Sequence, residues 1–288
     1  MRIAQLLCAF RQQQMMVTVT YDGSVWSRPQ PVLTTTLVGA PAMARLEDEL
    51  YCLHQDANNE GRLLAAVCEG STWGPDQSIP ASAMVFSPTA AACDGTLYAI
   101  YQSRDPAAQL EVRAKRAGRP WEASGVATSG ARAALSPTAA TLGQAVWVAY
   151  AGGSTFKTPD GTLRLRSLRD GRWSDEQTIP VETGSAPPSA AVFDGRLRIV
   201  HTAVNDVRSL RCATREPAGS WRDEPIPFAT GEPWVGAAAV AFGHELHVVY
   251  RSTSGTLASV AFDGARWHVP PQPNPPIPIA AQPGAIVN

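Results

Sequence analysis

Short apolar runs alternate with polar turns along the chain, and the runs recur in the same order. One copy spans 86–121: an alanine-rich run at 87–92, an Asp-Gly turn, an apolar run at 97–101, a polar loop, and a run at 110–113 that leads to Trp121. Three such runs, with a fourth around the tryptophan, are typical of short β-strands. The unit predicts a four-stranded meander, as in one blade of a β-propeller.

Tryptophan marks this unit at nearly equal intervals. Successive members lie 47, 48, 52, 48 and 46 residues apart, and another 47 residues separate the last from the first when the end of the chain is joined to its start. The members are Trp26, Trp73, Trp121, Trp173, Trp221 and Trp267. A repeat that closes on itself is expected of a ring. The sequence therefore predicts an all-β, six-bladed β-propeller of four-stranded antiparallel blades.

We expect one propeller domain over residues 1–288, closed by pairing of its two terminal segments. The tail at 284–287 is predicted to supply the inner strand of a composite blade, which removes the free edge between the first and last blades. The predicted blades are 38–80, 86–128, 135–180, 186–227 and 233–273, with the composite sixth formed by 1–32 and 280–288.

Each unit begins with small residues, as at 138–140, 189–191 and 237–239. Inner strands converge at the axis of a propeller, where large side chains would collide.

The tryptophans have two interpretations: they pack between blades as spacers, or they form six platforms on which sugars stack. The repeat favours the first.

Charge and composition exclude several partners. Lys and Arg total 24 against 25 Asp and Glu, without runs of like charge, so neither a nucleic-acid backbone nor an anionic membrane is expected as a partner. No stretch approaches the roughly 20 apolar residues of a membrane span. The 23 Gly and 24 Pro suit a fold with many turns.

Five cysteines, an odd number without a Cys-x-x-Cys pair, support neither a disulfide framework nor zinc, and no cofactor is expected. The apolar run that ends at Phe10 is short, lacks a cleavage site and fits the repeat. Reduced cysteines suit a cytoplasmic protein, or one exported without a standard signal peptide.

One face of the ring carries the candidate binding residues. In each unit the second run ends in a ring: Phe10, His54, Tyr101, Tyr150, His201 and Tyr250. These rings either cap the core between blades or contact a ligand at the mouth of the central channel. Polar residues follow them, namely Arg11, Gln55, Gln102, Thr202 and Arg251.

Sugars have apolar faces and hydroxyl edges, so aromatic planes beside Arg, Asp, Asn or Gln suit them. Trp234, outside the series of six, is the preferred stacking residue. The predicted ligand-binding set is Trp234, Tyr101, Tyr150, Tyr250, His54, His201, Arg251, Arg104 and Asp206, with further loop groups at Asp56, Asn58, Asn59, Asp105 and Asn205.

Signals for catalysis are weak. There is no nucleophile elbow, phosphate loop or His-Glu-x-x-His segment. His54 and His201 fall in opposite blades and so are not expected to share a metal. Asp56, Asp105, Asp206 and Glu232 are carboxylates of the type that glycosidases use in pairs, but nothing in the sequence requires an enzyme.

Ser-Pro-x-Ala-Ala, Asp-Gly-x-Leu, the ring that ends the second run and Gly-x-x-Trp recur in the units. Their arrangement resembles sialidase-like and lectin-like propeller repeats of bacterial proteins. The six-bladed architecture is similar to that of fungal and bacterial fucose-binding lectins. This resemblance implies a carbohydrate ligand.

The leading hypothesis is a carbohydrate-binding propeller without catalysis. One alternative is a glycosidase or lyase with a single site at the axial mouth. The second is a scaffold for protein interactions, which a propeller supports on any face. Assembly into an oligomer stays open.

Overall fold

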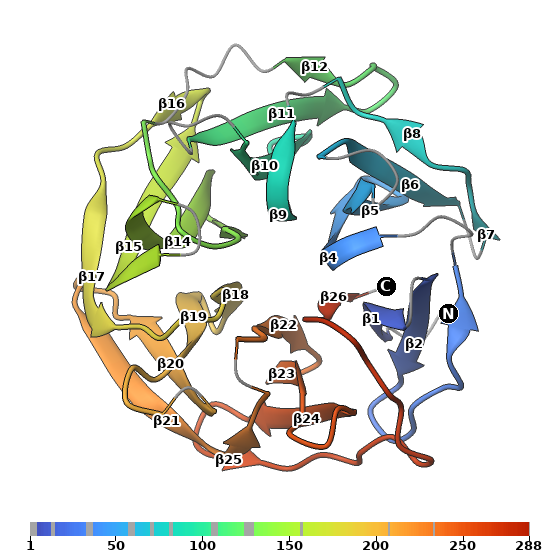
Figure 1. Ribbon diagram of the computed structural model, residues 1–288, viewed down its shortest axis with the longest axis vertical. Coiled ribbons are helices and arrows are strands. Elements are labelled where there is room, and N and C mark those ends of the chain that lie inside the picture. Colours follow the sequence, from blue (N-terminus) through green and yellow to red (C-terminus); the bar gives the residue numbers. More distant parts are fainter. Residues whose placement is uncertain are drawn as a thin grey trace.

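The computed structural model describes residues 5–12, 15–32, 37–56, 61–69, 72–80, 83–104, 109–123, 130–155, 158–206, 208–232 and 234–287. Within these ranges the chain forms strands and turns and contains no helix, so there is none that would span a membrane. Six small antiparallel sheets stand side by side around a central axis (Figure 1). The prediction of an all-β, six-bladed propeller is confirmed.

Every sheet runs outward from an inner strand at the axis to a short or interrupted outer strand. The first comprises β4 (Leu37–Leu46), β5 (Glu49–Asp56), β6 (Leu63–Glu69), β7 (Thr72–Trp73) and β8 (Gln77–Ser78); the second β9 (Met84–Cys93), β10 (Thr96–Ser103), β11 (Leu110–Arg116) and β12 (Glu122–Ala123). The third comprises β13 (Thr138–Leu142), β14 (Ala145–Thr155), β15 (Thr158–Arg169), β16 (Arg172–Trp173) and β17 (Gln177–Glu182). The fourth comprises β18 (Ser189–Phe193), β19 (Arg196–Thr202), β20 (Ser209–Arg215) and β21 (Trp221–Thr230); the fifth β22 (Ala237–Phe242), β23 (Glu245–Arg251), β24 (Leu257–Phe262) and β25 (Trp267–His268).

The sixth sheet joins the two ends of the chain. It consists of β26 (Gly284–Val287), β1 (Leu6–Gln12), β2 (Met15–Tyr21) and β3 (Gln30–Pro31). β26 runs antiparallel to β1, with Val287 opposite Leu6 and Gly284 opposite Ala9. Figure 1 shows β26 beside β1 in this sheet. The ring is therefore closed by main-chain hydrogen bonds between segments at opposite ends of the sequence.

The inner strands approach one another so closely that several positions admit only glycine. A Cβ atom on Gly284 would lie 2.3 Å from the carbonyl oxygen of Pro41, and one on Gly236 would lie 2.5 Å from that of Pro187. Both distances are far shorter than real Cβ contacts, and the obstructing atoms belong to the backbone. The small residues predicted at the axis are explained by this crowding.

Short hydroxyl side chains link neighbouring inner strands. Ser87 Oγ accepts the N–H of Ala40 at 2.7 Å, and Ser136 Oγ accepts the N–H of Ser87 at 3.0 Å. Further round the ring, Thr138 Oγ1 accepts the N–H of Ala190 at 2.7 Å. Because these bonds cross from one blade to the next, they fix the spacing of the blades at the axis and satisfy buried donors.

The tryptophans of the repeat pack near the rim of the disc. Trp26 and Trp121 are buried, and the other four are partly buried against the core clusters. Trp121 of the second blade meets Tyr51 of the first edge to face, with ring centroids 6.3 Å apart. This packing favours the interpretation that the series acts as spacers between blades.

A buried histidine lies at the seam between the fifth and the composite blade. The Nε2 atom of His247 is 3.2 Å from a Glu245 oxygen, and Nε2 of His268 is 2.8 Å from the other oxygen of the same carboxylate. The ring of Tyr21, from the composite blade, is 5.7 Å from the His247 ring. Burial lowers the pKa of His247 below its usual 6.5, although Glu245 opposes the shift. Folding therefore favours the neutral imidazole.

Replacing Gly284 with alanine should destabilise the ring at its closure. We expect Gly284→Ala to lower the free energy of unfolding by about 1–3 kcal/mol, because backbone atoms must move to admit the methyl group. Urea titration followed by circular dichroism measures this. Gly74→Ala is the matched control, because its Cβ would meet only Val67 O, at 3.4 Å. Equal stability of the two variants would contradict the expectation.

Acid should weaken the fold through His247. A lowered pKa in the folded state means that the unfolded chain takes up the proton first, so stability falls as the pH drops below 6.5. The slope from one such group is at most about 1.4 kcal/mol per pH unit. Urea titrations from pH 8 to 5 measure how the free energy of unfolding changes with pH. This change should be smaller in His247→Gln than in the native protein or in His268→Gln. An unchanged slope in His247→Gln would refute this.

Candidate functional site

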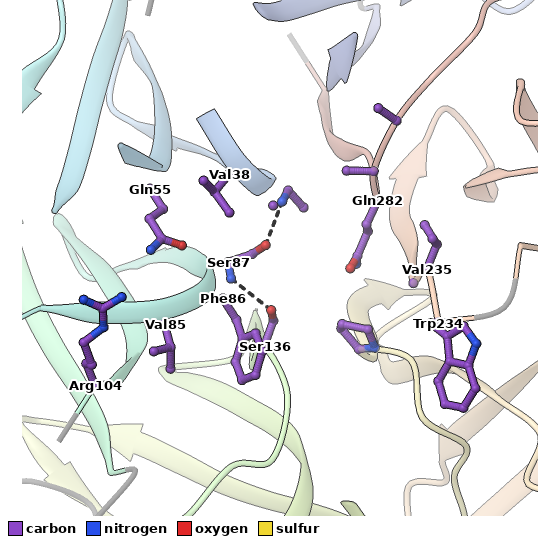
Figure 2. A pocket seen from close by; sticks show the side chains of 16 residues that line it. Val38, Gln55, Val85, Phe86, Ser87, Arg104, Ser136, Trp234, Val235 and Gln282 are labelled. Atoms are coloured by element: carbon purple, nitrogen blue, oxygen red, sulfur yellow. Dashed lines mark hydrogen bonds between the residues drawn. The ribbon is translucent and has the colours of Figure 1, made fainter. Parts of the chain in front are cut away.

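A cavity of about 650 Å³ lies over the axis at one face of the disc (Figure 2). This is the face at which inner strands begin and second strands end, as the pairing of Leu37 with Asp56 in the first blade shows. Its apolar lining comes from Val38, Val85, Phe86, Pro187, Trp234 and Val235, and its polar side chains are Gln55, Ser87, Arg104, Ser136 and Gln282. We call it the mouth cavity.

Two long inner strands build one wall of the mouth cavity. β4 and β9 have 10 residues each, whereas β13, β18, β22 and β26 have 5, 5, 6 and 4. In both long strands the pairing with the second strand is interrupted near a proline, Pro41 or Pro88. Proline cannot donate to the ladder, so the strand bulges there and continues above the ring.

The opposite wall comes from loops that lead into the fifth and composite blades. The N–H of Val235 donates to the carbonyl oxygen of Glu232 at 3.3 Å, which closes a tight turn. Trp234 holds the third position of that turn with φ 67°, a conformation that normally favours glycine. Its side chain is 65% exposed and borders the cavity. Figure 2 shows it on the opposite side of the cavity from Arg104 and Val85.

Aromatic residues with left-handed backbone are unusual, and the described chain has three: Phe86 (φ 63°), Phe228 (φ 67°) and Trp234. The other non-glycine residues with positive φ are acidic residues in tight turns: Glu47, Asp94, Asp170 and Asp194. Aspartate tolerates this conformation better than bulky residues do, so an aromatic residue there indicates backbone strain. Phe86 and Trp234 both line the mouth cavity.

The polar groups of the cavity are unevenly satisfied. Gln55 is 7% exposed, and its Nε2 donates to the carbonyl oxygen of Met84 at 3.4 Å, whereas its Oε1 has no partner. Although Gln55 borders the cavity, that oxygen has almost no accessible surface. On the far side, Gln282 Nε2 donates to the carbonyl oxygen of Ala237 at 2.7 Å. The described lining thus holds one guanidinium, from Arg104, and no carboxylate.

Two of the nine residues predicted to bind a ligand, Trp234 and Arg104, line the mouth cavity. The predicted rings of the second strands are buried and do not line it: His54, Tyr101, Tyr150, His201 and Tyr250.

Four of these rings reach a carboxylate within their own blade. His54 Nε2 lies 3.1 Å from Asp76, and His201 Nε2 lies 3.0 Å from Asp223. The hydroxyl of Tyr101 donates to Glu111 at 2.9 Å, and Tyr150 donates to Glu176. The position and burial of these rings favour the interpretation that they cap the core.

The remaining two predicted residues make contacts within the protein. Arg251 Nε donates to the carbonyl oxygen of Ile279 at 2.8 Å, and its NH1 lies 3.6 Å from Glu232. Asp206 is exposed and accepts from the Ser209 hydroxyl and the Arg208 N–H, which lower its pKa. Neither lines the mouth cavity. Asn58, Asn59 and Asp105 lie outside the described residues.

Sequence reasoning missed Phe86, and it named Gln55 only as a neighbour of His54. The backbone angle of Phe86 has no sequence signal beyond its place directly before a Ser-Pro pair.

Among the described residues, no group of three or more His, Cys, Asp or Glu side chains would hold a metal ion.

No family model matches the chain, and no curated protein matches it by sequence. Solved structures match its fold. AofleA from Arthrobotrys oligospora superposes with a TM-score of 0.72 at 13% identity, covering 95% of this chain and 82% of that one. Aleuria aurantia lectin, described as a fungal six-bladed β-propeller with a novel fucose recognition mode, gives 0.69 at 14% identity, with 94% and 90% covered. CoXyl43, a GH43 β-xylosidase/α-arabinofuranosidase from a compost microbial metagenome, gives 0.55 at 13% identity, with 83% and 96% covered.

The strain at Trp234 is measurable without a ligand. We expect Trp234→Gly to be more stable than Trp234→Ala by about 1 kcal/mol, because only glycine adopts φ 67° without a steric penalty. Urea titration of both variants gives the difference. Val269 is the control, since it is also exposed but lacks positive φ, and there the glycine variant should be the less stable. If the glycine variant were the less stable of the pair at both positions, strain at Trp234 would be contradicted.

Proposed function

We propose that the protein binds carbohydrate in the mouth cavity and does not cleave it. The observation that carries the proposal is Trp234, an exposed indole kept on a strained backbone at the edge of a cavity with polar groups in its far wall. The C–H face of a pyranose stacks on an indole, and its hydroxyl edge needs hydrogen-bonding partners. Gln55, Arg104 and the two serines are within the same lining.

The size of the cavity suits this role. Its volume of about 650 Å³ falls within the range of small-molecule sites, roughly 300–1,000 Å³. Sites of that kind are mostly apolar with a few convergent polar groups, and the lining described above has this balance. A short oligosaccharide therefore fits the space better than a single ion or a folded protein surface.

Structural neighbours support a sugar-binding role but leave the sugar open. At 13–14% identity they indicate a shared fold, and they include both a lectin and a glycosidase. Glycosidases generally use two carboxylates, and the described lining of the mouth cavity has none, which favours binding over cleavage. The identity of the sugar stays open, and the sialidase-like and bacterial character suggested by the repeat motifs stays a prediction.

The test is glycan binding by the native protein and by Trp234→Ala. A glycan array identifies ligands, and isothermal titration calorimetry then measures affinity. Loss of the stacking partner should weaken binding at least tenfold, since aromatic stacking contributes about 1.4 kcal/mol or more in such contacts.

Phe228→Ala is the matched control. Phe228 is also an exposed aromatic, 69% accessible, with left-handed backbone, but it does not line the cavity. Its removal should leave affinity unchanged. Absence of binding to any glycan at millimolar concentration, or equal affinity of Trp234→Ala and the native protein, would rule the proposal out.

A further inference from the structure

Two consecutive residues of β9 line the mouth cavity, which a regular strand does not allow. Side chains alternate between the two faces of a strand, so Val85 and Phe86 are expected to point in opposite directions. Both nevertheless belong to the lining. The pairing of β9 with β10 shifts register between Ile100 and Gln102, and Phe86 lies in the bulged segment with φ 63°. The bulge explains how Phe86 comes to line the cavity beside Val85.

Val38 of the neighbouring blade completes an apolar wall with these two residues. The wall lies on the side of the cavity away from Trp234 (Figure 2). Val38 is 41% exposed, and Val85 and Phe86 are half-buried, so a ligand in the cavity can contact all three. Adjoining apolar side chains that remain in contact with water favour an apolar partner.

Arg104 stands beside this apolar wall. Its backbone N–H donates to the carbonyl oxygen of Ala83 at 2.9 Å, which continues the ladder between β9 and β10. Because Val85 lies two residues after Ala83, the register places Val85 and Arg104 on the same face of this hairpin. The Arg104 side chain is exposed. Although Arg104 has other contacts within the protein, a guanidinium carries several N–H donors, so one such contact leaves others for a ligand.

A pyranose that carries only hydroxyl groups does not match both sides of the cavity. The sugar lies in the cavity itself, because the channel below encloses only about 100 Å³, enough for about three water molecules. If its C–H face stacks on Trp234, its polar groups face away from the indole, toward the apolar wall. Hydroxyls that lose water there without a hydrogen-bonding partner are unfavourable. A substituent that presents a methyl group to Val38, Val85 and Phe86 is favoured instead.

The guanidinium beside the wall indicates which substituent fits. A methyl ether offers a methyl group but only a weak acceptor. An acetamido group has a methyl group and, on the adjoining carbon, a carbonyl oxygen that can accept from Arg104 while the methyl group rests on the wall. Hydrogen bonds from a charged donor are stronger than neutral ones. The carbonyl oxygen of an amide is also a stronger acceptor than that of an ester, which favours an N-acetyl over an O-acetyl group.

We infer that the mouth cavity recognises a pyranose that carries an acetamido group. The acetyl methyl group packs on Val38, Val85 and Phe86, and the carbonyl oxygen accepts a hydrogen bond from Arg104. The inference rests on the proposed function and adds the class of ligand, the N-acetylated hexosamines.

Matched sugars test the inference on the native protein. The probes are the methyl pyranosides of glucose, galactose and mannose, each compared with its 2-acetamido and its free 2-amino counterpart by NMR titration. We expect at least one acetamido sugar to bind about tenfold more tightly than its hydroxyl counterpart, because it gains an apolar contact and a charge-assisted hydrogen bond. The amino counterpart gains neither and brings a second positive charge near Arg104, so it should bind most weakly.

Variants of Arg104 assign the hydrogen bond. Arg104→Met retains an unbranched side chain without donors and should reduce the preference for the acetamido sugar about tenfold. Arg208→Met is the matched control. Arg208 is an exposed arginine in the loop after the second strand of the fourth blade, as Arg104 is in the second blade, but it does not line the cavity. This control should keep the preference of the native protein.

Variants of Val38 assign the apolar contact. Val38→Thr replaces a methyl group with a hydroxyl of similar size and should reduce the same preference roughly threefold. Val204→Thr is the control, because Val204 is equally exposed, at 40%, and lies outside the lining. Both valines are exposed, so neither change removes a side chain from the core.

The outcomes separate the two proposals. If the native protein binds none of the probes and no array glycan, the proposed function fails and this inference with it. If sugars bind and Trp234→Ala weakens them, but the hydroxyl or amino member of every set binds as tightly as the acetamido member, only this inference is overturned. A preference for acetamido sugars that Arg104→Met and Val38→Thr both leave unchanged would also overturn it.

Discussion

The crowding of six inner strands at one axis is the constraint on which the rest of the molecule depends. Gly284 and Gly236 lack a Cβ because backbone oxygens occupy its place, and short hydroxyls such as Ser87 link strands that larger residues would force apart. Such packing leaves no room for a ligand within the channel. Whatever the ring binds along its axis must therefore be held at the ends of the strands.

The ring and the candidate site depend on different features of the sequence: the ring on the repeat, and the site on departures from it. The blades share their strand order, their tight turns and their tryptophan, and these features recur in every sector of the ring. The mouth cavity instead draws on departures from the repeat: longer inner strands in two blades, a bulge near Pro41 and Pro88, and a tryptophan where a turn favours glycine. Each departure contributes a wall or a side chain to the same cavity.

The fold could be predicted from the sequence because its signals are periodic and physical. The spacing of Trp26 to Trp267 and the small residues at the axis each follow from geometry that every blade must obey. The candidate site could be predicted only in part. Comparison of the repeats places Tyr101 and His201 at matching positions of their second strands, but that position does not tell whether a ring points into the channel or between blades. The left-handed backbone of Phe86 and the unpaired oxygen of Gln55 depend on tertiary contacts that no local pattern encodes.

The composite blade has a consequence for biosynthesis. During translation the N-terminal strands emerge from the ribosome first, yet β1 lacks its inner neighbour until 284–287 have been made. Until β26 is made, the nascent propeller is an open arc in which β1 has a free main-chain edge. Such an edge invites pairing with another nascent chain. Pairing of β26 with β1 closes the ring and removes that exposed edge.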